Sequence, residues 1–351
     1  MATAPSGSPS GDLLVPAGPP VAARPRRALI PQFGGIWGFV IRRILLGLLV
    51  LFIVSIVVFA ATQALGDPAR AILGRQATPE SLKALRDQLN LDRSVFSQYW
   101  SWLTGLLHGD AGVSYAAQIP VSDLIDERIV NSAFLVFCSA IISLPLAIAI
   151  GAYAALRRDK LFDSASSLIT LLFAAMPEFV IGLWLVVIFA TTVFPGTLPS
   201  ITQIPPGGRP WDDMTAMILP TATLVLTVTP YVARIMRASM IDVLESDYVE
   251  MARLKGLSER TVLIRHALPN ALGPVFQVIA LNLAYLAGGI IIIEYVFNYS
   301  GVGGAIQDAV LNHDLPVVQA LAMLIATVYV VLNLLADVAT ILVTPRLRTR
   351  L

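Results

Sequence analysis

Six long apolar runs constrain this chain more than any other feature of its sequence. They span about 44–65, 131–156, 163–194, 216–238, 274–297 and 317–343. A helix rises about 1.5 Å per residue, so roughly 20 apolar residues cross the ~30 Å hydrocarbon core of a bilayer. Charged residues make up only 13% of the chain, about half of their usual share in soluble domains. The sequence therefore predicts an all-α integral membrane protein with six transmembrane helices.

The third run, 163–194, is too long for a single straight crossing. The tripeptide Met176-Pro177-Glu178 interrupts it, and proline lacks the backbone donor that a continuous helix needs. We therefore expect a kink or an unwound turn at Pro177. Such a break is tolerated in a membrane bundle, because neighbouring helices and waters satisfy the freed carbonyl groups.

The distribution of Lys and Arg sets the expected orientation. With the N-terminus inside, the predicted inner segments hold 17 of the 24 Lys and Arg residues, as the positive-inside rule requires. Both termini are therefore predicted to be cytoplasmic. Residues 1–36 are rich in Pro, Ala, Ser and Gly and predict a disordered tail. Residues 37–345 form the predicted transmembrane domain, and residues 346–351 a second cytoplasmic tail.

The long segment 66–130, between the first two runs, falls on the extracytoplasmic side of this topology. Thr78 as an N-cap, Pro79 as the first helical residue and Ser81 two residues later predict the start of a helix. The following run, SVFSQYWSWLTGLL, is amphipathic. Its aromatic residues suit the outer membrane–water boundary, and packing onto the bundle is compatible with that position. We therefore expect a small helical cap.

Sequence motifs for covalent chemistry are missing. The chain has neither the P-loop pattern G-x-x-x-x-G-K-[ST] nor the zinc pattern H-E-x-x-H. His108, His266 and His313 fall on both sides of the predicted membrane, and Cys138 is the single cysteine. The net charge of +1 gives no reason to expect a nucleic acid. We predict no catalytic residue, no metal site, no cofactor and no nucleic-acid partner for this chain.

A few polar residues interrupt the apolar runs, among them Glu178, Gln277, Asn282 and Glu294. Ionisable groups at membrane depth are costly, so they usually face a cavity or a partner. We assign these four residues to a candidate path through the membrane. A structural hydrogen-bonding role is the alternative, and it is the favoured one for Glu294.

A polar stretch that begins at Asp247 separates the fourth and fifth runs on the predicted cytoplasmic side. Asp247, with Glu250 three residues later, predicts an N-cap with a partner similar to a capping box. Gly256 is placed to end this first helix in a left-handed conformation. Ser258 predicts a second N-cap, and Pro269 should stop the second helix before the next run. We therefore expect two short helices bent around Gly256.

Two kinds of partner suit this elbow, residues 245–270. Its basic residues favour anionic lipid head groups, but acidic residues interrupt them and a broad apolar face is missing. The mixed charges favour a protein partner instead. Ala252 is small enough to let another backbone approach closely.

The elbow resembles the EAA loop of binding-protein-dependent ABC importer permeases. The matching positions are Glu250, Met251, Ala252, Gly256, Ile264, Leu268 and Pro269. Met251 departs from the small residue usual at the second position, and this departure concerns how closely the first helix seats. Asp247 and Ser258 complete the docking loop for an ATPase that the resemblance implies.

The resemblance extends from about residue 37 to 348, and it is strongest to the first permease subunit of dipeptide, oligopeptide and nickel importers. The segments GDPARAILG, EYVFNYSGVGGAIQDAV and TPRLR carry it, the last with Thr344 where the family has Asp. It implies the type I ABC importer permease fold in a bacterial inner membrane. It implies a second permease subunit, two ATPase subunits that hold ATP and Mg, and an extracytoplasmic binding protein. Peptides are the leading substrate class, with nickel chelates, opines and oligosaccharides as alternatives.

An ion-driven secondary transporter is the principal alternative from another class of protein. Such transporters often contain inverted repeats with paired broken helices, whereas only one apolar run is broken here. An intramembrane enzyme is the third possibility, but no constellation of catalytic side chains supports it.

Overall fold

The computed structural model describes residues 36–343, apart from 75, 76, 90, 192, 195 and 206. These residues form helices joined by loops, and their only β-type pairing is a single bridge between Val113 and Pro120. The prediction of an all-α membrane protein is confirmed. The predicted tails and the Thr344 motif lie outside the described residues, apart from Ile36.

Four helices in the described part of the chain are long and apolar enough to cross a bilayer. They belong to α1 (Ile36–Gln63), α5 (Val121–Leu156), α8 (Ile218–Leu244) and α13 (Leu315–Val343). A bent helix pair supplies a fifth crossing if it counts as one span. α11 (Leu268–Val296) is as long as α13, but several of its side chains lie outside the described set. The count of six transmembrane helices therefore stays a prediction.

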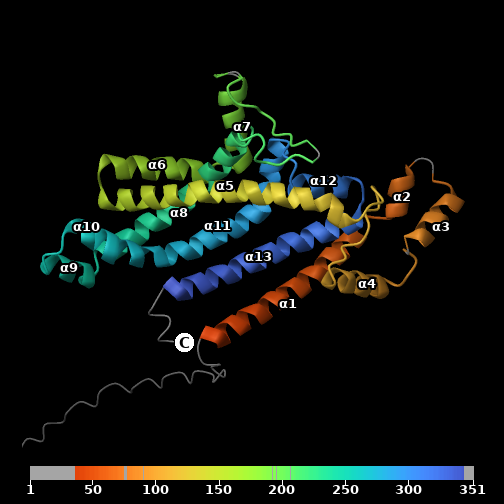
Figure 1. The fold of residues 1–351 in the computed structure, drawn as a ribbon, viewed down its shortest axis with the longest axis horizontal. Coiled ribbons are helices and arrows are strands. Elements are labelled where there is room, and N and C mark those ends of the chain that lie inside the picture. Colours follow the sequence, from red (N-terminus) through yellow and green to blue (C-terminus); the bar gives the residue numbers. More distant parts are fainter. Residues whose placement is uncertain are drawn as a thin grey trace, which may run out of the picture.

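The third apolar run is broken at Pro177. α6 (Leu161–Ala175) ends before it, while α7 (Glu178–Val186) begins directly after it and continues into a π turn, Val187–Thr191. The two parts are bent by 103°. The predicted break is confirmed in its unwound form, because Met176 and Pro177 both have extended backbone and α6 ends before them. Figure 1 shows α7 pointing away from α5 and α6.

Three long helices begin earlier than their apolar runs. α1 begins at Ile36 rather than near 44, α5 at Val121 rather than near 131, and α11 at Leu268 rather than near 274. The first turns of α5 contain charged residues such as Asp123, which an apolarity criterion excludes although a helix tolerates them. The last part of the predicted outer segment 66–130, from Val121 on, therefore belongs to α5.

Short helices collect at the two opposite ends of the long ones (Figure 1). At one end lie α2 (Pro68–Leu73), α3 (Pro79–Gln88) and α4 (Val95–Leu107). At the other end lie α9 (Asp247–Leu254) and α10 (Glu259–Thr261). A further short helix, α12 (Val302–Leu311), connects α11 to α13. This separation agrees with the predicted topology, which puts the outer segment and the elbow on opposite sides of the membrane.

The predicted helix start at Thr78 is confirmed. The Thr78 hydroxyl accepts a hydrogen bond from the Ser81 amide at 3.2 Å, and the Ser81 hydroxyl accepts one from the Thr78 amide at 3.0 Å. Pro79 occupies the first turn, where its missing N–H costs nothing because that donor has no partner inside the helix.

The aromatic residues of α4 divide between the two roles considered for them. Tyr99 and Trp102 pack against Phe59 of α1, with ring centroids 5.4 and 5.8 Å from it. Phe96 and Trp100 are exposed. One side of α4 therefore packs the outer segment against α1. The other side is exposed and can contact the membrane–water boundary.

The centre of the bundle is the contact between α5 and α8. Two thirds of the apolar window of α8 is buried, against 11% for α1. Gly151 of α5 lies directly on α8. A Cβ added there would be 2.7 Å from the Met236 Cβ and 3.0 Å from the backbone nitrogen of Arg237. Only glycine permits so close an approach, so α5 and α8 form a tightly packed pair, and α1 is a peripheral helix.

Candidate functional site

The elbow begins with a cap that differs from the predicted one. α9 starts at Asp247, so the N-cap is Ser246 and the predicted capping role of Asp247 is wrong by one residue. The Ser246 hydroxyl donates to the Val243 carbonyl at 2.5 Å instead of capping α9. Asp247 and Glu250 are exposed in the first turn, where their negative charges interact favourably with the helix dipole.

Gly256 ends α9 as predicted, with φ of +75°. Its amide donates to the Arg253 carbonyl at 2.9 Å, and the Leu257 amide donates to the Ala252 carbonyl at 3.4 Å. These two bonds define a Schellman motif. An added Cβ at Gly256 would meet nothing within 4 Å. Backbone conformation alone, and not space, therefore calls for glycine here.

The second half of the elbow is continuous with α11. The Ser258 hydroxyl accepts from the Thr261 amide at 3.4 Å, so the predicted second N-cap is confirmed. The prediction that Pro269 stops this helix is wrong. A π turn, Val262–Ala267, leads directly into α11, and Pro269 lies in the first turn of α11. Proline is tolerated in a first turn, because no intrahelical bond needs its N–H there.

The elbow has a small core of its own. Val249, Ala252 and Val262 are buried together, and Val243 and Leu244 at the end of α8 pack against them. Ala252 therefore permits close packing within the elbow itself. Because the elbow packs on α8 and continues into α11, a force on α9 acts on two long helices at once.

The exposed side of the elbow carries apolar side chains among its charged ones. Its exposed large apolar side chains are Tyr248, Met251, Leu254, Leu257 and Ile264. An exposed apolar patch of this kind marks a surface for a partner. The exposed pair formed by Arg253 and Glu259, 2.8 Å between Nε and Oε1, adds both signs of charge. Met251, where the pattern has a small residue, is exposed.

Two ion pairs that the sequence pattern did not reveal connect the region where α5 turns into α6 to the elbow and to α8. Arg158 pairs with Glu245, the first residue of the elbow. Asp163 receives two hydrogen bonds from Arg237 of α8, at 2.5 and 2.6 Å, and a third from the Asp159 amide at 3.0 Å. Charges at helix ends were visible in the sequence, but nothing local indicated which of them pair.

A cavity of about 670 Å³ adjoins the break between α6 and α7. Two of the four predicted path residues, Glu178 and Asn282, line it, and α8 and α11 supply other walls. The Tyr285 hydroxyl donates a hydrogen bond to Glu178. Gln277 is exposed and lies outside the lining. The structure thus brings together residues from α7 and α11 that are more than 100 positions apart in the sequence.

Glu294, the fourth predicted path residue, is enclosed by its own chain. Glu294 is only 1% exposed. It accepts hydrogen bonds from the Ser132 hydroxyl and, at 2.6 Å, from the Gly303 amide. Added Cβ atoms at Gly301 and Gly303 would collide with its carboxylate. Glu294 therefore connects α5, α11 and the start of α12, in agreement with the structural alternative considered for it.

No group of three or more His, Cys, Asp or Glu residues in the described part of the chain is placed to hold a metal ion. The candidate site has two parts. One is the exposed surface of the elbow. The other is the cavity beside the break between α6 and α7.

Comparison with known proteins gives a consistent assignment. The family described as "Binding-protein-dependent transport system inner membrane component" matches residues 147–349, and the corresponding N-terminal family matches residues 36–133. The chain is 36% identical over 312 residues to the glutathione transport system permease protein GsiC of Escherichia coli and of Shigella flexneri, covering 88% of this chain and 98% of each relative. It is 35% identical over 311 residues to the probable peptide ABC transporter permease protein y4tP of Sinorhizobium fredii, covering 88% and 99%.

A solved structure of the MetNI methionine ABC transporter aligns with 63% of this chain and 96% of its own, with a TM-score of 0.48 and 15% identity. That likeness is too distant to add to the assignment, which rests on the sequence relatives. The chain belongs to the family of binding-protein-dependent transport system inner membrane components, and it is a multi-pass permease component of an ABC importer in a bacterial inner membrane.

Proposed function

We propose that this permease forms half of the translocation path for peptides or a related small solute. The similarity to permeases named for glutathione and for peptides supports this substrate class. A second permease subunit forms the other half of the path, and an extracytoplasmic binding protein delivers the solute. Both termini and the elbow lie on the cytoplasmic side in this proposal.

The observation that carries the proposal is the exposed apolar face of the elbow, residues 245–270. The chain has no P-loop, so ATP-driven uptake would take its energy from another chain. The elbow is the docking surface for one of two ATPase subunits, which hold ATP and Mg. Its core packs on α8, so movement of the ATPase is transmitted to α8 and α11.

The cavity beside Pro177 is the part of the path that this chain contributes. Its walls are mainly apolar, and its polar side chains are Glu178, Thr227, Tyr231, Asn282 and Tyr285. Few polar groups suffice to orient a solute in such a cavity. Gln277, exposed on α11, would face the second permease. Glu294 acts in the path indirectly, by holding α5, α11 and α12 together.

Docking is tested by changing Leu254 to Glu, because Leu254 is 74% exposed on the elbow. The variant should lose co-purification with the ATPase and lose ATP-driven uptake in proteoliposomes. Leu161→Glu is the matched control, since Leu161 is 86% exposed at the start of α6 and lies outside the elbow. Equal binding of the ATPase by both variants would refute the docking surface. Uptake by vesicles that contain no ATPase subunit would favour an ion-driven transporter.

A further inference from the structure

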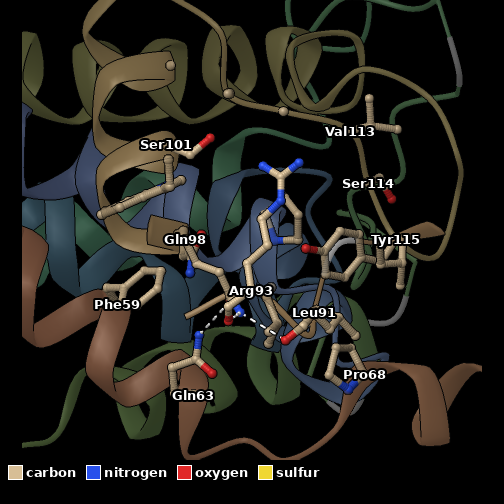
Figure 2. Close-up of a pocket in the computed structure, with 18 of the residues that line it drawn as sticks. Phe59, Gln63, Pro68, Leu91, Arg93, Gln98, Ser101, Val113, Ser114 and Tyr115 are labelled. Carbon is tan, nitrogen blue, oxygen red and sulfur yellow. Dashed lines mark hydrogen bonds between the residues drawn. The ribbon is translucent and has the colours of Figure 1, made fainter. Parts of the chain in front are cut away.

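A second cavity, of about 800 Å³, lies at the opposite end of the molecule from the elbow. The outer segment between α1 and α5 supplies most of its walls, and the end of α1 and the start of α13 close it. Its volume falls within the range of about 300–1,000 Å³ that is typical of small-molecule sites. Polar and charged side chains from several loops converge in it (Figure 2).

The lining of this cavity contains two cationic and two anionic side chains, Arg86, Arg93, Asp67 and Asp110. Arg86 pairs with Asp67 at 3.6 Å and with Asp92 at 3.4 Å. Asp110 accepts a hydrogen bond from the Gly112 amide at 2.8 Å. Arg93 differs, because within the described part of the chain its guanidinium has neither an ion pair nor a hydrogen bond. Arg93 is therefore a solvent-exposed cationic side chain of the lining without an ion-pair partner among the described residues, and Asp110 is an anionic one.

The backbone that carries Arg93 is held in place. The Gln98 side-chain amide donates to the Leu91 carbonyl at 3.0 Å and to the Arg93 carbonyl at 2.9 Å. Gln63 of α1 in turn donates to the Gln98 carbonyl oxygen at 3.3 Å. Figure 2 shows the Arg93 side chain extended inside the cavity, away from the contact between Gln63 and Gln98. Because these bonds already hold the backbone at Arg93, less conformational entropy is lost when Arg93 binds a partner.

The backbone at Tyr115, on another wall of the same cavity, is also held by hydrogen bonds. The two carboxylate oxygens of Asp314 accept from the Ser114 hydroxyl and from the amides of Tyr115, at 2.9 Å, and Ala116, at 3.3 Å. Burial, and then the charge of Asp314, raise the pKa of the Tyr115 hydroxyl. That hydroxyl therefore stays protonated at neutral pH and is available as a neutral donor in the lining.

We propose that this outer cavity binds a small solute through a carboxylate group, with Arg93 as its charged partner and Tyr115 as a second donor. A guanidinium binds a carboxylate through two parallel hydrogen bonds. A single guanidinium without an ion-pair partner matches a single carboxylate, whereas Asp67 and Asp110 in the lining disfavour a polyanion. The identification of the solute as a peptide, bound by its C-terminus, rests on the proposed function. The carboxylate site itself rests on the geometry of the cavity.

The test is calorimetric titration of the full chain in lipid nanodiscs, without ATP, against tri-alanine and against tri-alanine with an amidated C-terminus. Tri-alanine should bind and the amide should not. Arg93→Gln should weaken tri-alanine binding by roughly tenfold or more, since hydrogen bonds to charged groups contribute that much. Arg93→Lys should retain part of the affinity, because it keeps the charge but not the planar fork.

Arg70→Gln is the matched control. Arg70 is exposed on α2 in the same outer segment and does not line the cavity, so its loss should leave binding unchanged. Circular dichroism and size-exclusion profiles identical to those of the parent chain establish that the Arg93 variants are folded. Equal affinity of Arg93→Gln and the parent chain, equal affinity for peptide and amide, or no binding at millimolar concentration would each overturn the site. Binding measured without any ATPase keeps this result separate from ATP-driven uptake.

Discussion

Replacing Arg237 by Met tests how strongly the turn between α5 and α6 is fastened to α8. Arg237 supplies two of the three hydrogen bonds to Asp163, and the Asp163 side chain is only 5% exposed. Methionine keeps an apolar stem of similar length but leaves the buried carboxylate with one hydrogen bond, from the Asp159 amide, and with the more distant charge of Arg158. Removing one partner of a buried ion pair costs about 3–5 kcal/mol, because the remaining charge stays out of water.

The measurement is equilibrium unfolding in mixed detergent micelles with increasing sodium dodecyl sulfate, followed by helical circular dichroism. Arg158→Met is the matched variant, since Arg158 and Glu245 are 49% and 64% exposed. An exposed pair contributes about 0–1 kcal/mol, so this variant should unfold almost like the parent chain. The double variant Arg237→Met with Asp163→Leu should recover most of the lost stability, because apolar replacement of a buried pair is often neutral.

Two results would refute this reasoning. If Arg237→Met lowered the free energy of unfolding no more than Arg158→Met does, the carboxylate of Asp163 would not depend on its guanidinium partner. If the double variant were as unstable as the sum of its two single changes, the two side chains would contribute independently and their contact would carry no coupling energy.

Two other changes have outcomes that the structure specifies. Gly303→Ala should cost about 1–3 kcal/mol in the same unfolding assay, since its Cβ would be 2.8 Å from the Glu294 Oε2. Gly304→Ala, whose nearest neighbour would be 3.7 Å away, should not, and equal losses would contradict the packing around Glu294. Gly256→Pro cannot adopt the φ of +75° found there, and Glu250→Lys reverses a charge on the docking surface. Both should leave the long helices folded while ATP hydrolysis no longer drives uptake in proteoliposomes, and normal uptake would argue against the elbow as the coupling element.

Local patterns in the sequence were sufficient for much of this fold. The length of the apolar runs predicted the long helices, and the caps at Thr78 and Ser258 appear as expected. Gly256 has the left-handed conformation that its place after α9 predicted. These features depend on interactions between residues only a few positions apart, so the sequence contains all the information they need. The elbow was recognisable for the same reason, because its pattern lies within one short stretch.

Errors arose where tertiary context competes with a local rule. Pro269 does not end a helix, because the π turn before it lets the elbow pass into α11. The unwound turn at Pro177 was predicted, but its bend of 103°, by which α7 leaves the layer of α5 and α6, was not. In both cases a proline permits several backbone routes, and packing selects one.

The polar contacts around the two cavities and Glu294 join residues that are far apart in the sequence. Tyr285 meets Glu178 across 107 positions, Ser132 meets Glu294 across 162, and Ser114 meets Asp314 across 200. Nothing in the periodicity of either partner indicates such a pairing. By itself, the sequence determined which segments are apolar, roughly where the long helices lie and where the elbow lies. Only folding decided which polar groups meet, because a buried polar group is stable only where packing brings it a partner.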